Sequence, residues 1–214
     1  MLVKNRMSRN PITVKTDTSL PDALKIMRDN KVRRLPVLDK SGKLVGIVSD
    51  KDLLYASPSP ATSLSVWEIT ALIAKVKVSE LMTKKVTTVA EDCPIEEAAR
   101  IMADNKIGGL PVMRGDVMVG IITETDLFKI FVELMGAREQ GTRFALLVPE
   151  KKGSLAAMAQ AVTDLGGCIV ALGTFLGEDP TNRLLTIKVQ DVDKDELWAK
   201  WQEMGIKLED VRET

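Results

Sequence analysis

Hydrophobic and polar residues follow the same order twice along residues 1–135 of the chain. Each copy begins with a short β-branched stretch, continues with apolar residues at helical spacing, and ends with two apolar strands and a further helix. The copies align at an offset of 75 residues, which falls to 74 after one deletion near Lys40. A period of this length indicates one folding unit used twice in tandem. Because two units are too few for a solenoid, we expect them to pack on each other as a closed pair.

Both copies are predicted to have the element order β-α-β-β-α. In the first copy the expected elements are Ile12–Val14, a helix around Leu20–Met27, Arg34–Leu38, Leu44–Val48 and a helix from Asp50. In the second they are Val86–Val89, a helix around Ile95–Met102, Leu110–Met113, Met118–Ile122 and a helix from Glu124. Ser19 and Asp92 stand at or near the N-cap position of the first helix of each copy.

Residues 55–77 connect the two copies and open with a Ser-Pro repeat that is typical of a linker. The Ser65-x-x-Glu68 spacing is that of a capping box before an apolar helix over Val66–Ile73. We expect this helix to cover the core of the paired copies through Trp67 and Leu72.

The pattern changes after Gly136, and the remaining residues predict the order β-α-β-β-α-β of the ferredoxin-like motif. The expected elements are Phe144–Val148, Leu155–Leu165, Ile169–Leu176, Leu184–Val189, Asp195–Met204 and Ile206–Val211. The predicted fold class is therefore α+β. It consists of repeats at 1–54 and 78–135, packed as a pair, and a ferredoxin-like domain at 140–214.

Composition narrows the possible chemistry. The chain has no histidine, so the commonest metal ligand and the usual general acid–base at neutral pH are missing. Motifs of phosphate-binding loops, serine hydrolases and zinc proteases are also missing. We therefore expect a non-catalytic protein with no structural metal and no redox cofactor.

The expected location is the cytoplasm. Cys93 and Cys168 lie in different regions of the sequence, as is usual for reduced thiols. The N-terminus shows no apolar signal segment, and no apolar run is long enough for a membrane helix. A membrane partner is therefore not expected.

The net charge of zero hides a gradient along the chain. Residues 1–54 carry +6, whereas residues 55–135 and 136–214 carry −3 each. A nucleic-acid-binding face usually needs a denser basic stripe with aromatic residues, which are only 4% of this chain. We expect a small anionic ligand near the first copy, and no nucleic acid.

A short motif closes the second strand pair of each copy. It reads Gly46-Ile-Val-Ser49-x-x-Asp52 and then Gly120-Ile-Ile-Thr123-x-x-Asp126. The hydroxyl and the carboxylate can cap the helix that follows. A carboxylate at this position can equally accept two hydrogen bonds from the vicinal hydroxyls of a ribose, while nearby cations hold a phosphate. Local chemistry leaves both interpretations open.

These repeats resemble a tandem pair of CBS domains, known as a Bateman module. Leu-Pro-Val in the middle strand, at 35–37 and 110–112, and the closing motif match that family twice in register over about 1–135. The C-terminal segment resembles an ACT domain, although Glu150 and Lys152 replace that family's aspartate and proline. The whole order is similar to acetoin-utilisation accessory proteins of bacteria.

CBS pairs generally bind AMP, ADP, ATP or S-adenosylmethionine between the repeats. The resemblance implies that Asp52 and Asp126 hold ribose hydroxyls, with Ser49 and Thr123 close to the ligand. The phosphate would fall to Lys51, Arg33 and Arg34. The implied adenine pocket consists of Thr13, Val14, Pro36, Ile47, Thr88, Val89, Pro111 and Ile121.

The two implied sites differ in charge. In the second copy Gly108 and Gly109 replace the two arginines, and Thr125 replaces Lys51. We therefore predict one strong nucleotide site that uses the cations of the first copy, and a second site that is weak or empty.

The function implied by the resemblance is a regulatory sensor of an adenine nucleotide. It would form a homodimer and transmit its state to a protein partner, in or near acetoin or acetyl-CoA metabolism. The alternatives are an S-adenosylmethionine sensor and a ligand-free interaction module. The ACT-like loop, with Glu150, Gly153 and Ser154, would bind an amino acid or serve only in dimerisation.

Overall fold

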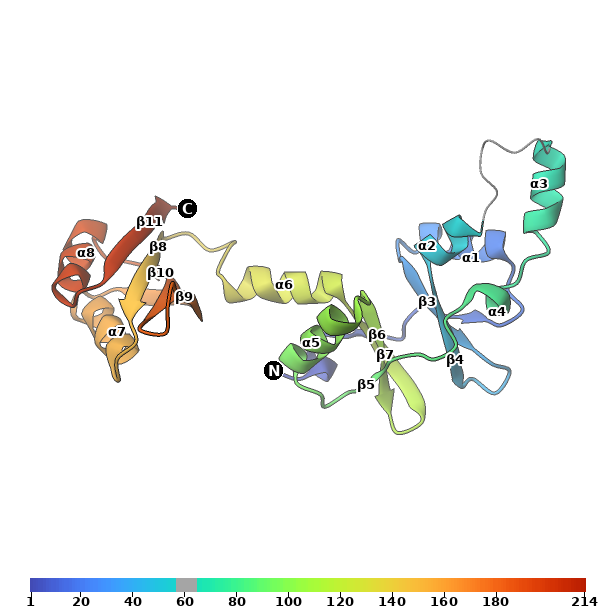
Figure 1. Cartoon of the computed structure of the whole chain (residues 1–214), viewed down its shortest axis with the longest axis horizontal. Coiled ribbons are helices and arrows are strands. Elements are labelled where there is room, and N and C mark those ends of the chain that lie inside the picture. Colours follow the sequence, from blue (N-terminus) through green and yellow to red (C-terminus); the bar gives the residue numbers. More distant parts are fainter. Residues whose placement is uncertain (57–64) are drawn as a thin grey trace. The chain divides into compact units, whose positions relative to one another are not determined.

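The computed structural model describes residues 1–56 and 65–214 of the chain, so the Ser-Pro repeat lies outside the described residues. Two compact units make up the chain, Met1–Leu127 and Phe128–Thr214 (Figure 1). Among the described helices, none has the length and apolar character needed to cross a membrane.

The first repeat has the predicted order of elements. They are β2 (Val14–Lys15), α1 (Leu20–Asp29), β3 (Arg34–Leu38), β4 (Leu44–Ser49) and α2 (Asp50–Tyr55). Ser19 starts α1 by accepting a hydrogen bond from the Asp22 amide, as its N-cap position predicts. The helix then buries Leu20, Ala23 and Met27 against the strands, as their helical spacing requires.

The second repeat has the same order of elements. Its elements are β5 (Val89–Ala90), α5 (Ile95–Asn105), β6 (Gly109–Arg114), β7 (Val117–Thr123) and α6 (Glu124–Leu134). The helix α5 begins at Ile95, as predicted, and its N-cap is Pro94, which makes no side-chain bond, so Asp92 lies near the cap rather than at it. The first strands, β2 and β5, are shorter than predicted because the residues before Val14 and Val89 leave the sheet.

The two repeats exchange their first residues. The segment β1 (Ser8–Arg9) pairs with β7 of the second repeat. Ahead of it a 3-10 turn, η1 (Val3–Asn5), places Val3 in the second repeat's core. In the same way α4 (Val78–Leu81) places Val78 in the first repeat's core, and Thr83 bridges to Ile47 of β4. Each repeat therefore completes the sheet and core of the other, so the two form a closed pair.

The connector helix α3 spans Val66–Ile73, as predicted. The capping box is confirmed, since the Ser65 amide and hydroxyl both donate to Glu68, at 2.9 and 2.7 Å. The expected docking through Trp67 and Leu72 is wrong, because these side chains are 86% and 51% exposed. Of the described side chains of α3, Ile73 at its C-terminal end packs on the first repeat's core.

The second unit confirms the ferredoxin-like prediction. Its elements are β8 (Thr142–Pro149), α7 (Ser154–Asp164), β9 (Cys168–Leu176), β10 (Asn182–Gln190), α8 (Lys194–Glu203) and β11 (Lys207–Glu213). The strands form one antiparallel sheet in the order β11-β8-β10-β9. Trp201 of α8 is fully buried against Phe144 of β8, with ring centroids 5.1 Å apart. The complete chain is thus of the α+β class.

Candidate functional site

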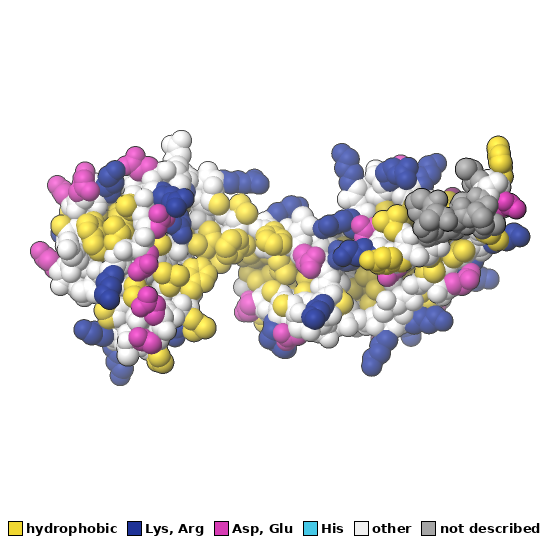
Figure 2. Space-filling model, turned by 45° about the horizontal axis from the view of Figure 1, so that its top comes forward, with side chains coloured by type: hydrophobic (Ala, Val, Ile, Leu, Met, Phe, Trp, Pro, Cys, Tyr) yellow, Lys and Arg dark blue, Asp and Glu magenta, His cyan; other side chains and the backbone are white. Residues whose placement is uncertain are grey.

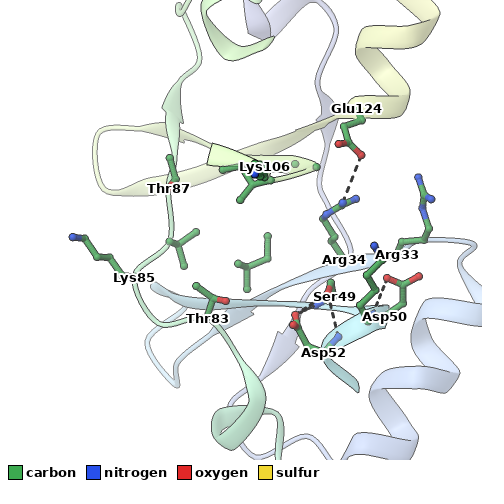
Figure 3. Close-up of a pocket in the computed structure, with 16 residues that line it drawn as sticks. Arg33, Arg34, Ser49, Asp50, Asp52, Thr83, Lys85, Thr87, Lys106 and Glu124 are labelled. Carbon is green, nitrogen blue, oxygen red and sulfur yellow. Dashed lines mark hydrogen bonds and ion pairs between the residues drawn. The ribbon is translucent and has the colours of Figure 1, made fainter. Parts of the chain in front are cut away.

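A cleft of about 410 Å³ opens between the two repeats. We call it the Asp52 cleft, because Ser49 and Asp52 of the first repeat's closing motif line it together with Ile47. Its other lining residues are Arg33, Arg34, Asp50, Lys51, Thr83, Lys85, Val86, Thr87, Lys106, Ile107, Gly108, Gly109 and Glu124 (Figure 3). Most of the opposite wall therefore comes from the second repeat.

A second cleft, of about 290 Å³, is its counterpart under the repeat offset. Thr123 and Asp126 of the second closing motif line this Asp126 cleft, together with Ile121. The remaining lining residues are Ser8, Arg9, Asn10, Pro11, Ile12, Lys31, Val32, Arg33, Arg34 and Thr125. Here most of the opposite wall comes from the first repeat, because the chain exchange places residues 8–12 beside β7.

The closing motif caps a helix and still leaves an oxygen for a ligand. Oδ2 of Asp52 accepts hydrogen bonds from the Ser49 amide and hydroxyl, at 2.8 and 2.7 Å. Oδ2 of Asp126 accepts the same pair of bonds from Thr123, at 2.9 and 2.7 Å. Within the described part of the chain, no hydrogen bond reaches Oδ1 of either aspartate. Capping and ligand binding are therefore compatible at both positions.

Both clefts carry more positive than negative side chains. The Asp52 cleft has five cations (Arg33, Arg34, Lys51, Lys85 and Lys106) and three carboxylates (Asp50, Asp52 and Glu124). The Asp126 cleft has four cations (Arg9, Lys31, Arg33 and Arg34) and one carboxylate, Asp126. Figure 2 shows Lys and Arg side chains on the surface of the unit that contains the repeats, as on the second unit. An anionic group is thus favoured in both clefts.

This distribution differs from the predicted one, in which the cations of the first repeat served a single site. Lys51 does line the Asp52 cleft, but Arg33 and Arg34 line both clefts. The sequence prediction also missed Lys85 and Lys106 in one cleft and Arg9 and Lys31 in the other. The alignment of Lys31 with Lys106 was a usable signal, because the two residues are identical and stand just before the middle strand of each repeat.

Arg34 occupies the space between the two clefts. Its side chain is 23% exposed, and its guanidinium forms an ion pair of 3.8 Å with Glu124 at the start of α6. Arg34 reaches toward Glu124, whereas Arg33 points away from it (Figure 3).

Two of the predicted adenine-pocket residues, Ile47 and Ile121, line the clefts. Val14 and Val89 instead belong to the cores of the two repeats, because the chain enters the sheet at these residues. Pro36 and Pro111 are buried beside Ile47 and Ile121 on the neighbouring strands, and neither they nor Thr13 and Thr88 are among the lining residues. The segments that do face the clefts lie slightly earlier, at residues 11–12 and 86–87.

In the second unit, a groove of about 550 Å³ lies at the loop between β8 and α7. Glu150, Gly153 and Ser154 line it, as does Arg183 from β10. Arg183 donates to Glu150 at 2.7 Å, and the Ser154 hydroxyl donates to the Pro149 carbonyl at 3.1 Å. Gly153 precedes α7 with φ +87°, a conformation that favours glycine.

Metal binding finds no support in the described ranges 1–56 and 65–214, where no group of three or more Cys, Asp or Glu residues could hold an ion. The cysteines in these ranges, Cys93 and Cys168, are both free thiols.

Comparison with known proteins settles the family. The model of the CBS domain matches residues 3–59 and 78–133, which correspond to the two repeats. The chain belongs to the CBS domain family. The match ends at residue 133, so it does not extend into the sheet of the second unit.

Three solved structures resemble the CBS pair. A Vibrio cholerae structure described as an acetoin utilization protein, AcuB, is 36% identical with a TM-score of 0.54, and the match covers 65% of this chain and 96% of that one. The CBS pair of protein MJ0100, in complex with 5′-methylthioadenosine and S-adenosyl-L-methionine, is 31% identical with a TM-score of 0.52. That match covers 65% of this chain and 98% of the MJ0100 chain. CBSX2 of Arabidopsis thaliana in complex with AMP is 33% identical with a TM-score of 0.51, and the match covers 61% of this chain and 96% of the CBSX2 chain. Two of these three CBS structures thus hold adenosine compounds.

Proposed function

We propose that this protein is a non-catalytic regulatory sensor that binds an adenine nucleotide, AMP, ADP or ATP, between its CBS repeats. The observation that carries the proposal is the pair of aspartates, Asp52 and Asp126, each at the edge of a cleft whose other walls carry cations. The adenosine compounds held by the CBS pairs of MJ0100 and CBSX2 support the same ligand class.

Each part of a nucleotide has a chemical counterpart in the clefts. The ribose hydroxyls bind the carboxylates of Asp52 and Asp126, which retain Oδ1 for this purpose. The base lies against Ile47 in one cleft and Ile121 in the other. The phosphates pair with the guanidinium and ammonium groups, and such charge-assisted bonds are stronger than neutral ones. The cations on the opposite walls are Lys85 and Lys106 in the Asp52 cleft, and Arg9 and Lys31 in the Asp126 cleft.

A regulatory protein needs a surface that transmits its state. Along α6, Phe128, Phe131 and Leu134 are 70%, 52% and 59% exposed, and Figure 2 shows hydrophobic side chains along this helix. Exposed apolar patches often mark protein interfaces. We propose that the chain forms a homodimer and that a regulated protein partner reads its ligand state. The likeness to AcuB supports a place in or near acetoin or acetyl-CoA metabolism.

Thermal unfolding with a ligand panel tests the nucleotide proposal. A ligand at about 100 times its Kd should raise the free energy of unfolding by about 2.7 kcal/mol, which shifts Tm by several degrees. AMP, ADP or ATP should produce this shift in the wild-type chain, and Asp52→Ala with Asp126→Ala should abolish it. A shift with S-adenosylmethionine alone would reassign the ligand. No shift with any compound would leave a ligand-free interaction module.

The groove beside α7 supports a second, independent proposal, that the ACT-like unit binds an amino acid. Arg183 supplies a cation for the ligand carboxylate, and Glu150 supplies a partner for its ammonium group. Equilibrium dialysis against a mixed amino-acid pool should enrich at least one amino acid, and Arg183→Ala should remove the enrichment. If no amino acid is enriched, the loop serves in dimerisation only.

A further inference from the structure

Arg34 is one of two residues shared by the linings of the Asp52 and Asp126 clefts, the other being Arg33. The remaining cations each line one cleft. Among them, Lys106 serves the Asp52 cleft, and its counterpart Lys31 serves the Asp126 cleft. A phosphate in either cleft therefore has its own lysine, but the two clefts must share Arg34.

The second repeat is built to accommodate this one guanidinium. A Cβ on Gly108 would overlap the Arg34 guanidinium, and a Cβ on Gly109 would lie 3.2 Å from Arg34 Cδ. Under the repeat offset Gly109 is the counterpart of Arg34. Because Gly109 stands at the counterpart position, the second repeat has no arginine equivalent to Arg34, and Gly108 leaves space for the Arg34 guanidinium. One guanidinium therefore lies where an exact repeat would place two.

The ion pair that holds Arg34 is weak. The distance to Glu124 is 3.8 Å, and the Glu124 side chain is 52% exposed. Partly exposed pairs of this length contribute little, because water competes for both groups. A ligand phosphate, with more negative charge and better geometry for a guanidinium, would draw Arg34 away from Glu124.

We propose that Arg34 couples the two clefts. The inference rests on the proposed nucleotide function and adds its regulation. The first nucleotide recruits Arg34 to its phosphate, so the second cleft is left without that cation. The two clefts therefore bind nucleotide with negative cooperativity, and occupancy of the second cleft responds only at higher nucleotide concentration.

Isothermal titration calorimetry with AMP measures this coupling. Asp126→Ala isolates the Asp52 cleft, and Asp52→Ala isolates the Asp126 cleft, so each intrinsic Kd is obtained separately. In the wild-type chain the product of the two stepwise Kd values should exceed the product of the isolated values by about fivefold or more, the usual lower range of allosteric coupling. In the Arg34→Ala background the two products should agree within error.

Two further variants separate coupling from simple loss of charge. Arg33 also lines both clefts, but it is exposed and points away from Glu124 (Figure 3), so Arg33→Ala should weaken binding and retain the fivefold excess. Glu124→Gln keeps Arg34 and weakens its present pair, so it should tighten the first step by a few-fold. Thermal unfolding of each variant checks that it folds.

The outcomes are distinguishable. AMP binding to two independent clefts, or an excess that survives Arg34→Ala, would overturn the coupling and leave the nucleotide function intact. Failure of AMP, ADP and ATP alike to bind the wild-type chain would overturn both.

Discussion

Met7 packs against Gly120 so closely that its Sδ lies 2.5 Å from the point a Cβ on that glycine would occupy. The relationship is repeated between Met82 and Gly46. Each methionine comes from the exchanged segment of one repeat and lies on β4 or β7 of the other. These two contacts therefore join the repeats and, with them, the walls of both clefts.

Substitution of these glycines should destabilise the first unit to different degrees. The three atoms nearest to a Cβ on Gly46 all belong to the Met82 side chain, whose Sδ and Cγ can rotate away, whereas a Cβ on Gly120 would also lie 2.9 Å from the Ser8 carbonyl oxygen. Gly120→Ala should thus cost about 1–3 kcal/mol, as overpacking usually does, and Gly46→Ala less. Thermal denaturation followed by circular dichroism compares the two.

Double variants that also truncate the methionine provide the control for that comparison. In a Met82→Ala background, Gly46→Ala should cost much less than in the wild-type chain, because the side chain nearest to the new Cβ has been removed. In a Met7→Ala background, Gly120→Ala should keep more of its cost, since the Ser8 carbonyl remains. Equal losses in the two glycine variants would contradict this account of the repeat interface.

The order of elements was predictable, because buried faces repeat along the chain at helical or strand spacing. Leu20, Ala23 and Met27 mark α1, and Ala98 and Met102 mark α5, as buried residues of the two cores. The exchange of first residues was not predictable, because β1 pairs only Ser8 and Arg9 with β7. Two residues carry no periodic pattern, and their partner lies more than a hundred residues away.

The candidate site was predictable in part for a related reason. Asp52 and Asp126 belong to a repeated motif, so they stand out in one sequence. The opposite walls, with Lys106 and Lys31, come from the other repeat, and spacing along the chain does not show which residues face each other across an interface. Arg34 shows the same limit, since its place between the clefts follows from packing against Gly108.

The closing aspartate should have separable roles in folding and binding. Asp52 completes the capping box of α2, so Asp52→Ala should reduce the free energy of unfolding by about 0.5–2 kcal/mol without any ligand. Asp52→Asn keeps an accepting oxygen and should lose less. Urea denaturation of both variants measures this. Identical stability of the two variants would show that the carboxyl group does not cap the helix.

Lys188 should stabilise the second unit through two backbone carbonyls. Its side chain is only 4% exposed, and its ammonium donates to the Gly136 and Glu139 carbonyl oxygens at 3.0 and 2.5 Å. Lys188→Met should cost about 2–3 kcal/mol, because it removes two charge-assisted bonds and leaves the Glu139 carbonyl without its donor, whereas the Gly136 carbonyl still accepts from the Glu139 amide. Urea denaturation followed by tryptophan fluorescence reports this loss through the buried Trp201.

Lys194→Met is the matched control for that prediction. Lys194 also forms an ion pair, with Glu213 at 2.7 Å, but both side chains are largely exposed. Its removal should change stability little. A larger loss in Lys194→Met than in Lys188→Met would contradict the role given to the buried lysine.

The two cysteines should differ in their reactivity with pH. Burial raises the pKa of the Cys93 thiol, and the carboxylates of Glu97, Asp92 and Glu96 raise it further. Less of it is therefore thiolate at a given pH, and the thiolate is the reactive form. In Cys168→Ser, alkylation of Cys93 by iodoacetamide should be slow at pH 8 and keep accelerating above about pH 9, beyond the range of an ordinary thiol.

Mass spectrometry of alkylated Cys168→Ser and Cys93→Ser follows each thiol alone. Cys168 is exposed and should react first at pH 8. A Cys93 rate at pH 8 equal to that of Cys168 would show that its burial does not protect it.

The claim that Asp52 and Asp126 hold a ribose is tested most directly by comparing AMP with 2′-deoxy-AMP in calorimetric titrations. Loss of one hydroxyl bonded to a carboxylate should weaken binding to the wild-type chain by about tenfold or more, since such bonds contribute about 1.5–3 kcal/mol. In the double variant Asp52→Asn/Asp126→Asn, AMP should bind more weakly and its preference over 2′-deoxy-AMP should fall to about twofold or less, because the carboxylates that distinguish the two ligands are gone. Equal affinity of the wild-type chain for both ligands, or an unchanged preference in the double variant, would contradict the assignment of the clefts as nucleotide sites held by these aspartates.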